Sequence, residues 1–226
     1  ETPCRTAVVS DGKCLNYFKL WKGILDRSEQ LRSEGLSASR PYVFRAVQDW
    51  DFILTYCAVH HLGAIAVPLE KGIPDEKFLQ IKAEAESCTF SADICDILYT
   101  TGTTGKSKGV VLTHLNDVAI AENVMYGTQM APDNVEVIPM PLNHAFGMRR
   151  YQSDIVNGGT VCLMDGMAFI GTLWKLMEKY RVTSMALSPA SLGMIFQLSG
   201  DRIGEYKDQM HYIQIGSAPL MEADKQ

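Results

Sequence analysis

Residues Tyr99–Gly109 read YTTGTTGKSKG, and this stretch decides how the chain folds around it. It lies between two apolar runs rich in β-branched residues, Ile94–Thr100 and Val110–Thr113, which predict strands. Its glycines let the backbone turn tightly and direct N–H groups toward one point, while its threonines add hydroxyls and its lysines add positive charge. These donors suit a polyphosphate, whose oxygens accept charge-assisted hydrogen bonds. The stretch therefore predicts a phosphate-binding loop between two strands.

This loop has two other possible interpretations, a P-loop and a plain hairpin turn. The P-loop of NTPases needs a glycine where this chain has Thr100, and a helix directly after its Lys-Ser pair, where Val110–Leu112 predicts a strand. A plain hairpin turn is the other alternative. The density of four threonines, three glycines and two lysines in the loop exceeds what a turn requires, which favours phosphate binding.

Outward from the loop, short apolar runs alternate with longer segments of helical periodicity. The predicted strands are Thr6–Ser10, Cys14–Asn16, Tyr42–Val47, Ala64–Leu69, Ile94–Thr100, Val110–Thr113, Val135–Pro139, Thr160–Met164, Thr183–Leu187 and His211–Ile215. The predicted helices run from Tyr17 to Gly35, from Phe52 to near Gly63, from Pro74 to about Glu86, from Asn116 to Tyr126, from Phe169 to Tyr180 and from Ala190 to Leu198. A further helical stretch follows the loop at Asn143-His144 and ends at about Asn157. Strands separated by single helices predict an α/β fold, with mostly parallel sheets and helices on both faces.

Composition narrows the class of protein. The chain has 226 residues, 46% of them hydrophobic and 21% charged, as expected for a folded globular protein. A net charge of -5 without a basic tract argues against a nucleic-acid partner. No apolar run reaches the roughly 18–20 residues of a membrane span. The six cysteines form no C-x-x-C pair or zinc spacing, so we expect reduced thiols and a cytoplasmic protein.

The loop Tyr99–Gly109 resembles the signature phosphate loop of the acyl-adenylate-forming superfamily, which includes acyl-CoA synthetases, luciferases and the adenylation domains of peptide synthetases. Ser107 stands where the family usually has proline, which should loosen the loop without removing a ligand. Further segments are similar to family motifs and follow the family's order, so that the resemblance spans nearly the whole chain. They are Leu15–Leu20, Leu62–Leu69, Pro141–Gly147, Gly158–Val161 and Gly216–Leu220.

The resemblance implies roles for particular residues. Lys108 would hold the β- and γ-phosphates of ATP, and Thr100 would also hold Mg²⁺. His144 would close the acyl pocket and touch the carboxylate, so Lys108 and His144 are the expected catalytic residues. The residues expected to bind the nucleotide are Thr100, Thr101, Gly102, Thr103, Thr104, Gly105 and Lys108 for the phosphates and Gly216, Ser217, Ala218 and Pro219 for the adenine; those expected to bind the acid are His144, Phe146 and Gly147.

Each of these roles has a simpler structural alternative. A lysine such as Lys108 is often only a solvated charge, and a lone histidine such as His144 is often a satisfied structural residue. Gly216–Pro219 is, by local sequence alone, also an ordinary turn between a strand and a helix. The clustering of these residues in motifs that follow the family's order favours the functional interpretation.

The sequence around His144 bears on the acid. Amino-acid-activating relatives carry an aspartate there to pair with the substrate ammonium, and Pro141–Tyr151 contains no carboxylate. An unpaired buried ammonium is costly, which favours a fatty, aryl or other simple carboxylic acid. Arg149 and Arg150 are unusual after Gly147, and the sequence is compatible with a surface feature or with contacts to a polar acyl group or a partner.

The implied reaction uses Mg²⁺-ATP to convert a carboxylic acid to acyl-AMP, and then usually transfers the acyl group to coenzyme A. We expect residues 1–226 to be part of the N-terminal AMP-binding domain, because the family's magnesium-binding glutamate, its ribose-binding aspartate and its C-terminal domain with a catalytic lysine have no counterpart here. Between Leu69 and Asp96 the chain also has fewer residues than the family usually has, which predicts a trimmed lobe. The isolated chain is therefore expected to be a poor catalyst. The alternatives are a non-catalytic nucleotide- or acyl-binding module and an amino-acid-activating adenylation domain.

Overall fold

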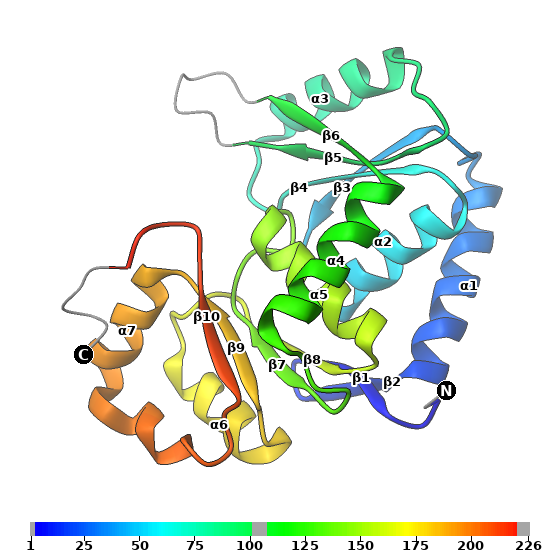
Figure 1. The fold of residues 1–226 in the computed structure, drawn as a ribbon. Coiled ribbons are helices and arrows are strands. Elements are labelled where there is room, and N and C mark those ends of the chain that lie inside the picture. The colour runs from blue at the N-terminus through cyan, green and yellow to red at the C-terminus, as the bar shows by residue number, and fades with distance from the viewer. Residues whose placement is uncertain (1–2, 101–107, 221–226) are drawn as a thin grey trace.

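The structure is a computed structural model that describes residues 3–100 and 108–220. Two sheets organise this part of the chain (Figure 1). The larger sheet has the strand order β10-β9-β7-β8-β1-β2, and the smaller has the order β3-β4-β5-β6. The strands are β1 (Thr6–Ser10), β2 (Lys13–Asn16), β3 (Pro41–Ala46), β4 (Ile65–Glu70), β5 (Ile94–Tyr99), β6 (Gly109–Thr113), β7 (Val135–Ile138), β8 (Thr160–Leu163), β9 (Ser184–Leu187) and β10 (Tyr212–Ile215).

Helices cover both sheets and fill the space between them. Figure 1 shows α2, α4 and α5 between the two sheets, α3 on the outer face of the smaller sheet, and α6 and α7 on the outer face of the larger one. The helices are α1 (Tyr17–Ser33), α2 (Trp50–His61), α3 (Asp75–Ser87), α4 (His114–Thr128), α5 (Ala145–Asn157), α6 (Ile170–Tyr180) and α7 (Pro189–Ser199), with a 3₁₀ helix at Gly200–Tyr206. The predicted α/β architecture with helices on both faces is confirmed.

The strands are mostly parallel, as predicted. Two neighbouring pairs are antiparallel, β1 with β2 and β5 with β6. In the second pair Tyr99 lies opposite Gly109, and the N–H of Thr100 donates to the carbonyl of Lys108 at 3.0 Å. A short connection between consecutive strands requires this antiparallel arrangement, whereas parallel strands need a long crossover. The predicted phosphate loop thus connects two paired strands.

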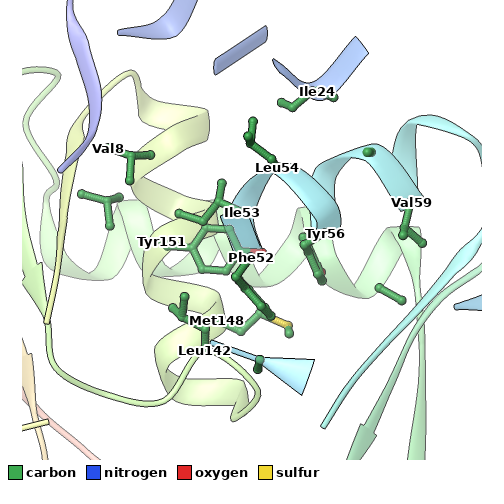
Figure 2. Close-up of a cluster of buried hydrophobic side chains, with 14 of the residues drawn as sticks. Val8, Ile24, Phe52, Ile53, Leu54, Tyr56, Val59, Leu142, Met148 and Tyr151 are labelled. Atoms are coloured by element: carbon green, nitrogen blue, oxygen red, sulfur yellow. The ribbon is translucent and has the colours of Figure 1, made fainter. Parts of the chain in front are cut away.

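The layer between the sheets is held by a buried cluster to which α2 and α5 both contribute (Figure 2). Tyr151 of α5 packs edge-on against Phe52 and Tyr56 of α2, with ring centroids 6.1 and 5.7 Å apart. Leu142 and Met148, on either side of the start of α5, are almost completely buried. Burying a large apolar side chain contributes about 1.5–3 kcal/mol, so these contacts hold the N-terminus of α5 firmly in place.

Two of the differences between the observed helices and the expected ones have a clear physical reason. The 3₁₀ helix at Gly200–Tyr206 was not predicted, because it is too short for a helical period to be recognised. Helix α4 starts at His114, two residues earlier than predicted, because Thr113 and Asn116 cap it reciprocally: the Asn116 N–H donates to the Thr113 hydroxyl at 3.1 Å, and the Thr113 N–H donates to the Asn116 side chain at 3.0 Å.

Candidate functional site

The two ends of the predicted phosphate loop lie side by side. The N–H of Thr100 donates to the carbonyl of Lys108, whose side chain is exposed, and the Thr100 hydroxyl lies 3.5 Å from the same oxygen. The five predicted phosphate-binding residues between them lie outside the described part of the chain; they are Thr101, Gly102, Thr103, Thr104 and Gly105. The strand pairing therefore positions the two ends of the loop.

His144 occupies the residue directly before α5. Its backbone is extended, its carbonyl accepts a hydrogen bond from Met148 N at 2.9 Å, and its side chain does not cap the helix. The N-terminus of a helix carries a partial positive charge and unsatisfied N–H groups, which makes it suitable for an anion. The imidazole of His144 is half-buried beside this helix end.

Gly147 determines how the segment before α5 folds back on the helix. A Cβ atom at this position would lie 2.5 Å from the carbonyl oxygen of Pro141 and 2.8 Å from that of Met140. Both are backbone atoms, so the close approach requires glycine. Gly147 thereby holds the Met140–His144 segment against the first turn of α5.

Gly216 and Phe146 bring two of the predicted motifs into contact. Gly216 follows β10, and its N–H donates to the carbonyl of Leu187 at 3.0 Å. A Cβ on Gly216 would lie 3.0 Å from Cζ of the Phe146 ring. The next residue, Ser217, has a φ of 72°. Ser217, Ala218 and Pro219 are exposed, so this turn presents its surface beside the start of α5.

A groove of 640 Å³ opens between α4 and α5, next to β10. Phe146 lines this groove, and the same ring meets Gly216. The apolar lining residues are Leu112, Ala119, Ile120, Val124, Ala145 and Phe146, and the polar ones are Asn116, Asn123, Arg149, Arg150 and Gln214. A cavity with apolar walls and a few polar groups is the usual form of a small-molecule site.

Arg150, on the groove wall, belongs to a buried polar network. Its Nε donates to Oε1 of Glu136 at 2.6 Å, and its Nη2 forms an ion pair with the other Glu136 oxygen. It also donates to Gln214 at 2.7 Å and to the Tyr212 hydroxyl at 2.6 Å. Burial is the largest single effect and would lower the pKa of Arg150, but the hydrogen bond and charge of Glu136, together with the weaker effects of Tyr212 and Asp154, outweigh it and raise the pKa. The guanidinium stays charged and compensated.

Arg149 belongs to a second cluster, in which the ligand atoms of His60, Cys95, Asp96 and Asp117 all lie within 4.8 Å of one another. Such a grouping resembles a metal site, but the Arg149 guanidinium already supplies a cation, 2.7 Å from Asp117 and 3.7 Å from Asp96. Burial and the charge of Asp96 raise the pKa of Asp117. For Asp96, burial is the largest single effect and would raise the pKa, but the hydrogen bonds and charge of His60 and the hydrogen bonds of Tyr56 and Asp117 together outweigh it and lower the pKa.

The pairing of Arg149 and Arg150 with buried acids was not expected from the sequence. Arg149 and Arg150 are 8% and 1% exposed, so neither is a surface feature. One local signal was available: Glu136 interrupts the otherwise apolar strand β7 and is fully buried. A buried carboxylate requires a positive or hydrogen-bonding partner, but its identity depends on how α5 crosses the sheet.

The arrangement of the two sheets and their helices is that of the N-terminal domain of adenylate-forming enzymes. The fold matches MatB from Rhodopseudomonas palustris with a TM-score of 0.85 at 18% identity, covering 98% of this chain and 54% of that one. It also matches o-succinylbenzoate CoA synthetase (MenE) from Bacillus subtilis, solved with its acyl-adenylate intermediate, with a TM-score of 0.83 at 18% identity, covering 96% of this chain and 66% of that one.

Residues 82–226 match the family described as AMP-binding enzyme, and the chain belongs to this family. It is 31% identical to 4-coumarate--CoA ligase-like 5 of Oryza sativa subsp. japonica over 61% of this chain and 27% of the relative. It is 22% identical to 2-succinylbenzoate--CoA ligase of Bacillus mycoides (strain KBAB4) over 96% of this chain and 52% of the relative. The chain therefore spans about half or less of the length of these relatives. Within residues 3–100 and 108–220, no helix is long and apolar enough to cross a membrane.

Proposed function

We propose that this chain is part of an enzyme that uses ATP to activate a carboxylic acid as an acyl-adenylate and then transfers the acyl group to coenzyme A. The contact between Phe146 and Gly216 carries this proposal. It joins a largely apolar groove to the turn that follows β10, in a chain whose family is described as AMP-binding enzyme. A nucleotide held at the turn and an acid held in the groove would meet at this contact.

The acid would lie in the groove with its carboxylate toward His144 and the N-terminus of α5. The partial positive charge of this helix end and its lack of a side-chain cap support a carboxylate there. Phe146 and Gly147 would shape the entrance. The adenine would lie against Gly216–Pro219, and the phosphates against the segment from Thr100 to Lys108.

The first step would break the bond between the α- and β-phosphates. A carboxylate oxygen attacks the α-phosphorus, pyrophosphate leaves, and acyl-AMP forms. Lys108 would stabilise the negative charge on the leaving pyrophosphate, and the loop would position the reactants. Thr100 would offer Mg²⁺ one hydroxyl, which suits an ion that keeps several waters. In the second step the sulfur of coenzyme A attacks the acyl carbon and AMP leaves.

The apolar walls of the groove support a fatty, aryl or other simple carboxylic acid. The free cysteines support a cytoplasmic enzyme, because thiols stay reduced in that compartment. Residues 1–226 would form part of the N-terminal AMP-binding domain, since solved relatives of this fold are longer than this chain. Efficient catalysis would require the remainder of such an enzyme. A slow or inactive isolated chain is therefore the expected result.

The test is acid-dependent exchange of pyrophosphate into ATP, measured with the longest natural protein that contains these residues. The panel holds short, medium and long fatty acids, aryl acids and amino acids. We expect exchange with fatty or aryl acids, its loss in Lys108→Ala, and its retention in Lys22→Ala, which removes an exposed lysine of α1. Binding of Mg²⁺-ATP without exchange for any acid would contradict the enzyme proposal and leave a non-catalytic binding module.

A further inference from the structure

The groove between α4 and α5 contains two arginines, which would ordinarily indicate an anionic substrate. The charge around each arginine shows otherwise. Arg150 forms a two-pronged ion pair with Glu136, which is fully buried, and its remaining hydrogen bonds go to Gln214 and Tyr212. A planar guanidinium that is matched to a carboxylate in this way has both its charge and its donors committed.

The charge of Arg149 is also compensated, in this case by two acids. It lies 2.7 Å from Asp117 of α4 and 3.7 Å from Asp96 of β5, and it donates to Gln152 at 2.6 Å. Two carboxyl groups therefore face one guanidinium. His60 also lies 3.0 Å from Asp96, so with both carboxyl groups ionised the cluster of Arg149, His60, Asp96 and Asp117 has no net positive charge even when His60 is protonated.

Among the described residues that line the groove, a second carboxylate at the far end of a substrate would meet no uncompensated cation. It would lose its hydration against apolar walls that include Ile120, Val124 and Phe146. It would also be repelled by Glu136 and Asp117, the carboxylates that pair with the two arginines of the groove wall. Removing an ion from water without a partner is strongly unfavourable.

We infer that the groove selects monocarboxylic acids with an uncharged acyl group, and that Glu136 and Asp117 enforce this selection by neutralising Arg150 and Arg149. This inference rests on the proposed function of the groove. The uncharged side-chain amides of Asn116, Asn123 and Gln214 also line the groove and would hydrogen-bond to a hydroxyl or carbonyl group on the acyl chain.

The test measures acid-dependent exchange of pyrophosphate into ATP by the longest natural protein that contains these residues. It compares pairs of acids that differ only in whether the far end carries a carboxylate. The pairs are butanoate with butanedioate, octanoate with octanedioate, and 3-phenylpropanoate with 3-(4-carboxyphenyl)propanoate. We expect kcat/KM to be at least tenfold higher for the monocarboxylate of every pair that supports exchange. Equal or better use of the dicarboxylate would overturn the inference alone. Absence of exchange with every acid would overturn the proposed function, and the inference with it.

Two variants test the role of the acids. Glu136→Gln and Asp117→Asn each remove one compensating charge, and each should raise the dicarboxylate-to-monocarboxylate ratio of kcat/KM severalfold. Asp117 is only partly buried, so its variant carries the test if the fully buried Glu136→Gln does not fold. Asp75→Asn removes an exposed carboxylate paired with Arg45 and should leave the ratio unchanged. A ratio that stays constant in the folded Glu136 and Asp117 variants would overturn the assignment, because loss of stability alone does not change relative specificity.

Discussion

Gly216 and Phe146 are 70 positions apart in the chain, yet a Cβ atom on Gly216 would lie 3.0 Å from the tip of the Phe146 ring. This contact connects the turn after β10 to the start of α5. Phe146 also lines the groove between α4 and α5. Any side chain larger than hydrogen at Gly216 must displace the ring or the turn.

A larger residue in place of Gly216 should clash with the Phe146 ring, and a smaller residue in place of Phe146 should relieve this clash. Gly216→Ala is expected to weaken nucleotide binding severalfold while lowering the free energy of unfolding by less than about 1 kcal/mol, since the ring tip can yield. Adding Phe146→Leu should restore part of the binding. Nucleotide titration and urea unfolding of both single variants and the double variant measure the coupling. Additive effects in this cycle would show that the contact is unimportant for binding.

Gly147 should tolerate substitution much less well than Gly216. Gly147→Ala places Cβ 2.5 Å from the Pro141 carbonyl oxygen, and backbone atoms cannot move aside cheaply. We expect a loss of about 1–3 kcal/mol in the free energy of unfolding, measured with urea. The matched control is Gly193→Ala in α7, where a Cβ meets nothing within 4 Å. That change should stabilise the protein by up to about 1 kcal/mol, because alanine is the better helix former. Similar effects of the two changes would contradict the packing described at Gly147.

The buried pair of Arg150 and Glu136 should show strong thermodynamic coupling. Arg150→Met leaves the Glu136 carboxylate without its cation and should cost about 3–5 kcal/mol in the free energy of unfolding. The double variant Arg150→Met/Glu136→Gln removes both charges and should be more stable than Arg150→Met alone. Urea unfolding of the two single variants and the double variant checks this order. A double variant less stable than Arg150→Met would show that the pair is not the main interaction of either residue.

Asp154 should make stability depend on pH. Burial, followed by the negative charge of Glu136, raises the pKa of Asp154 well above its ordinary value of 3.8. The folded state therefore keeps this proton at pH values where the unfolded state has lost it. The contribution of Asp154 to stability is complete below the unfolded pKa and is lost as pH rises toward the folded pKa, by at most about 1.4 kcal/mol per pH unit.

Asp154→Asn should remove this loss, because an amide has no proton to release and its oxygen can still accept from Asn134, as Asp154 does at 2.7 Å. Urea unfolding at several pH values between about 5 and 8 compares the slopes. The exposed Asp75→Asn serves as the control. Parallel slopes for the native protein and Asp154→Asn would mean that another group titrates.

Local patterns in the sequence were sufficient to predict the strands and helices and the family resemblance. Alternation of apolar residues reports which face of a segment avoids water, and glycine-rich turns report where the backbone bends. Helix α1 and strands β1 and β10 follow these rules closely, and so does the position of the loop between β5 and β6. These features depend on residues that are neighbours along the chain.

The tertiary structure alone decided which distant residues meet. The strand order β10-β9-β7-β8 places Gln214 and Glu136 on one side of the larger sheet, where α5 delivers Arg150 to both. The same crossing sets Phe146 against Gly216 and pairs Arg149 with Asp117. Periodicity carries no information on strand order or helix crossing, because those depend on how buried surfaces fit together. The sequence therefore determined the segments and the position of the loop between β5 and β6, whereas the tertiary structure determined the charge inside the groove.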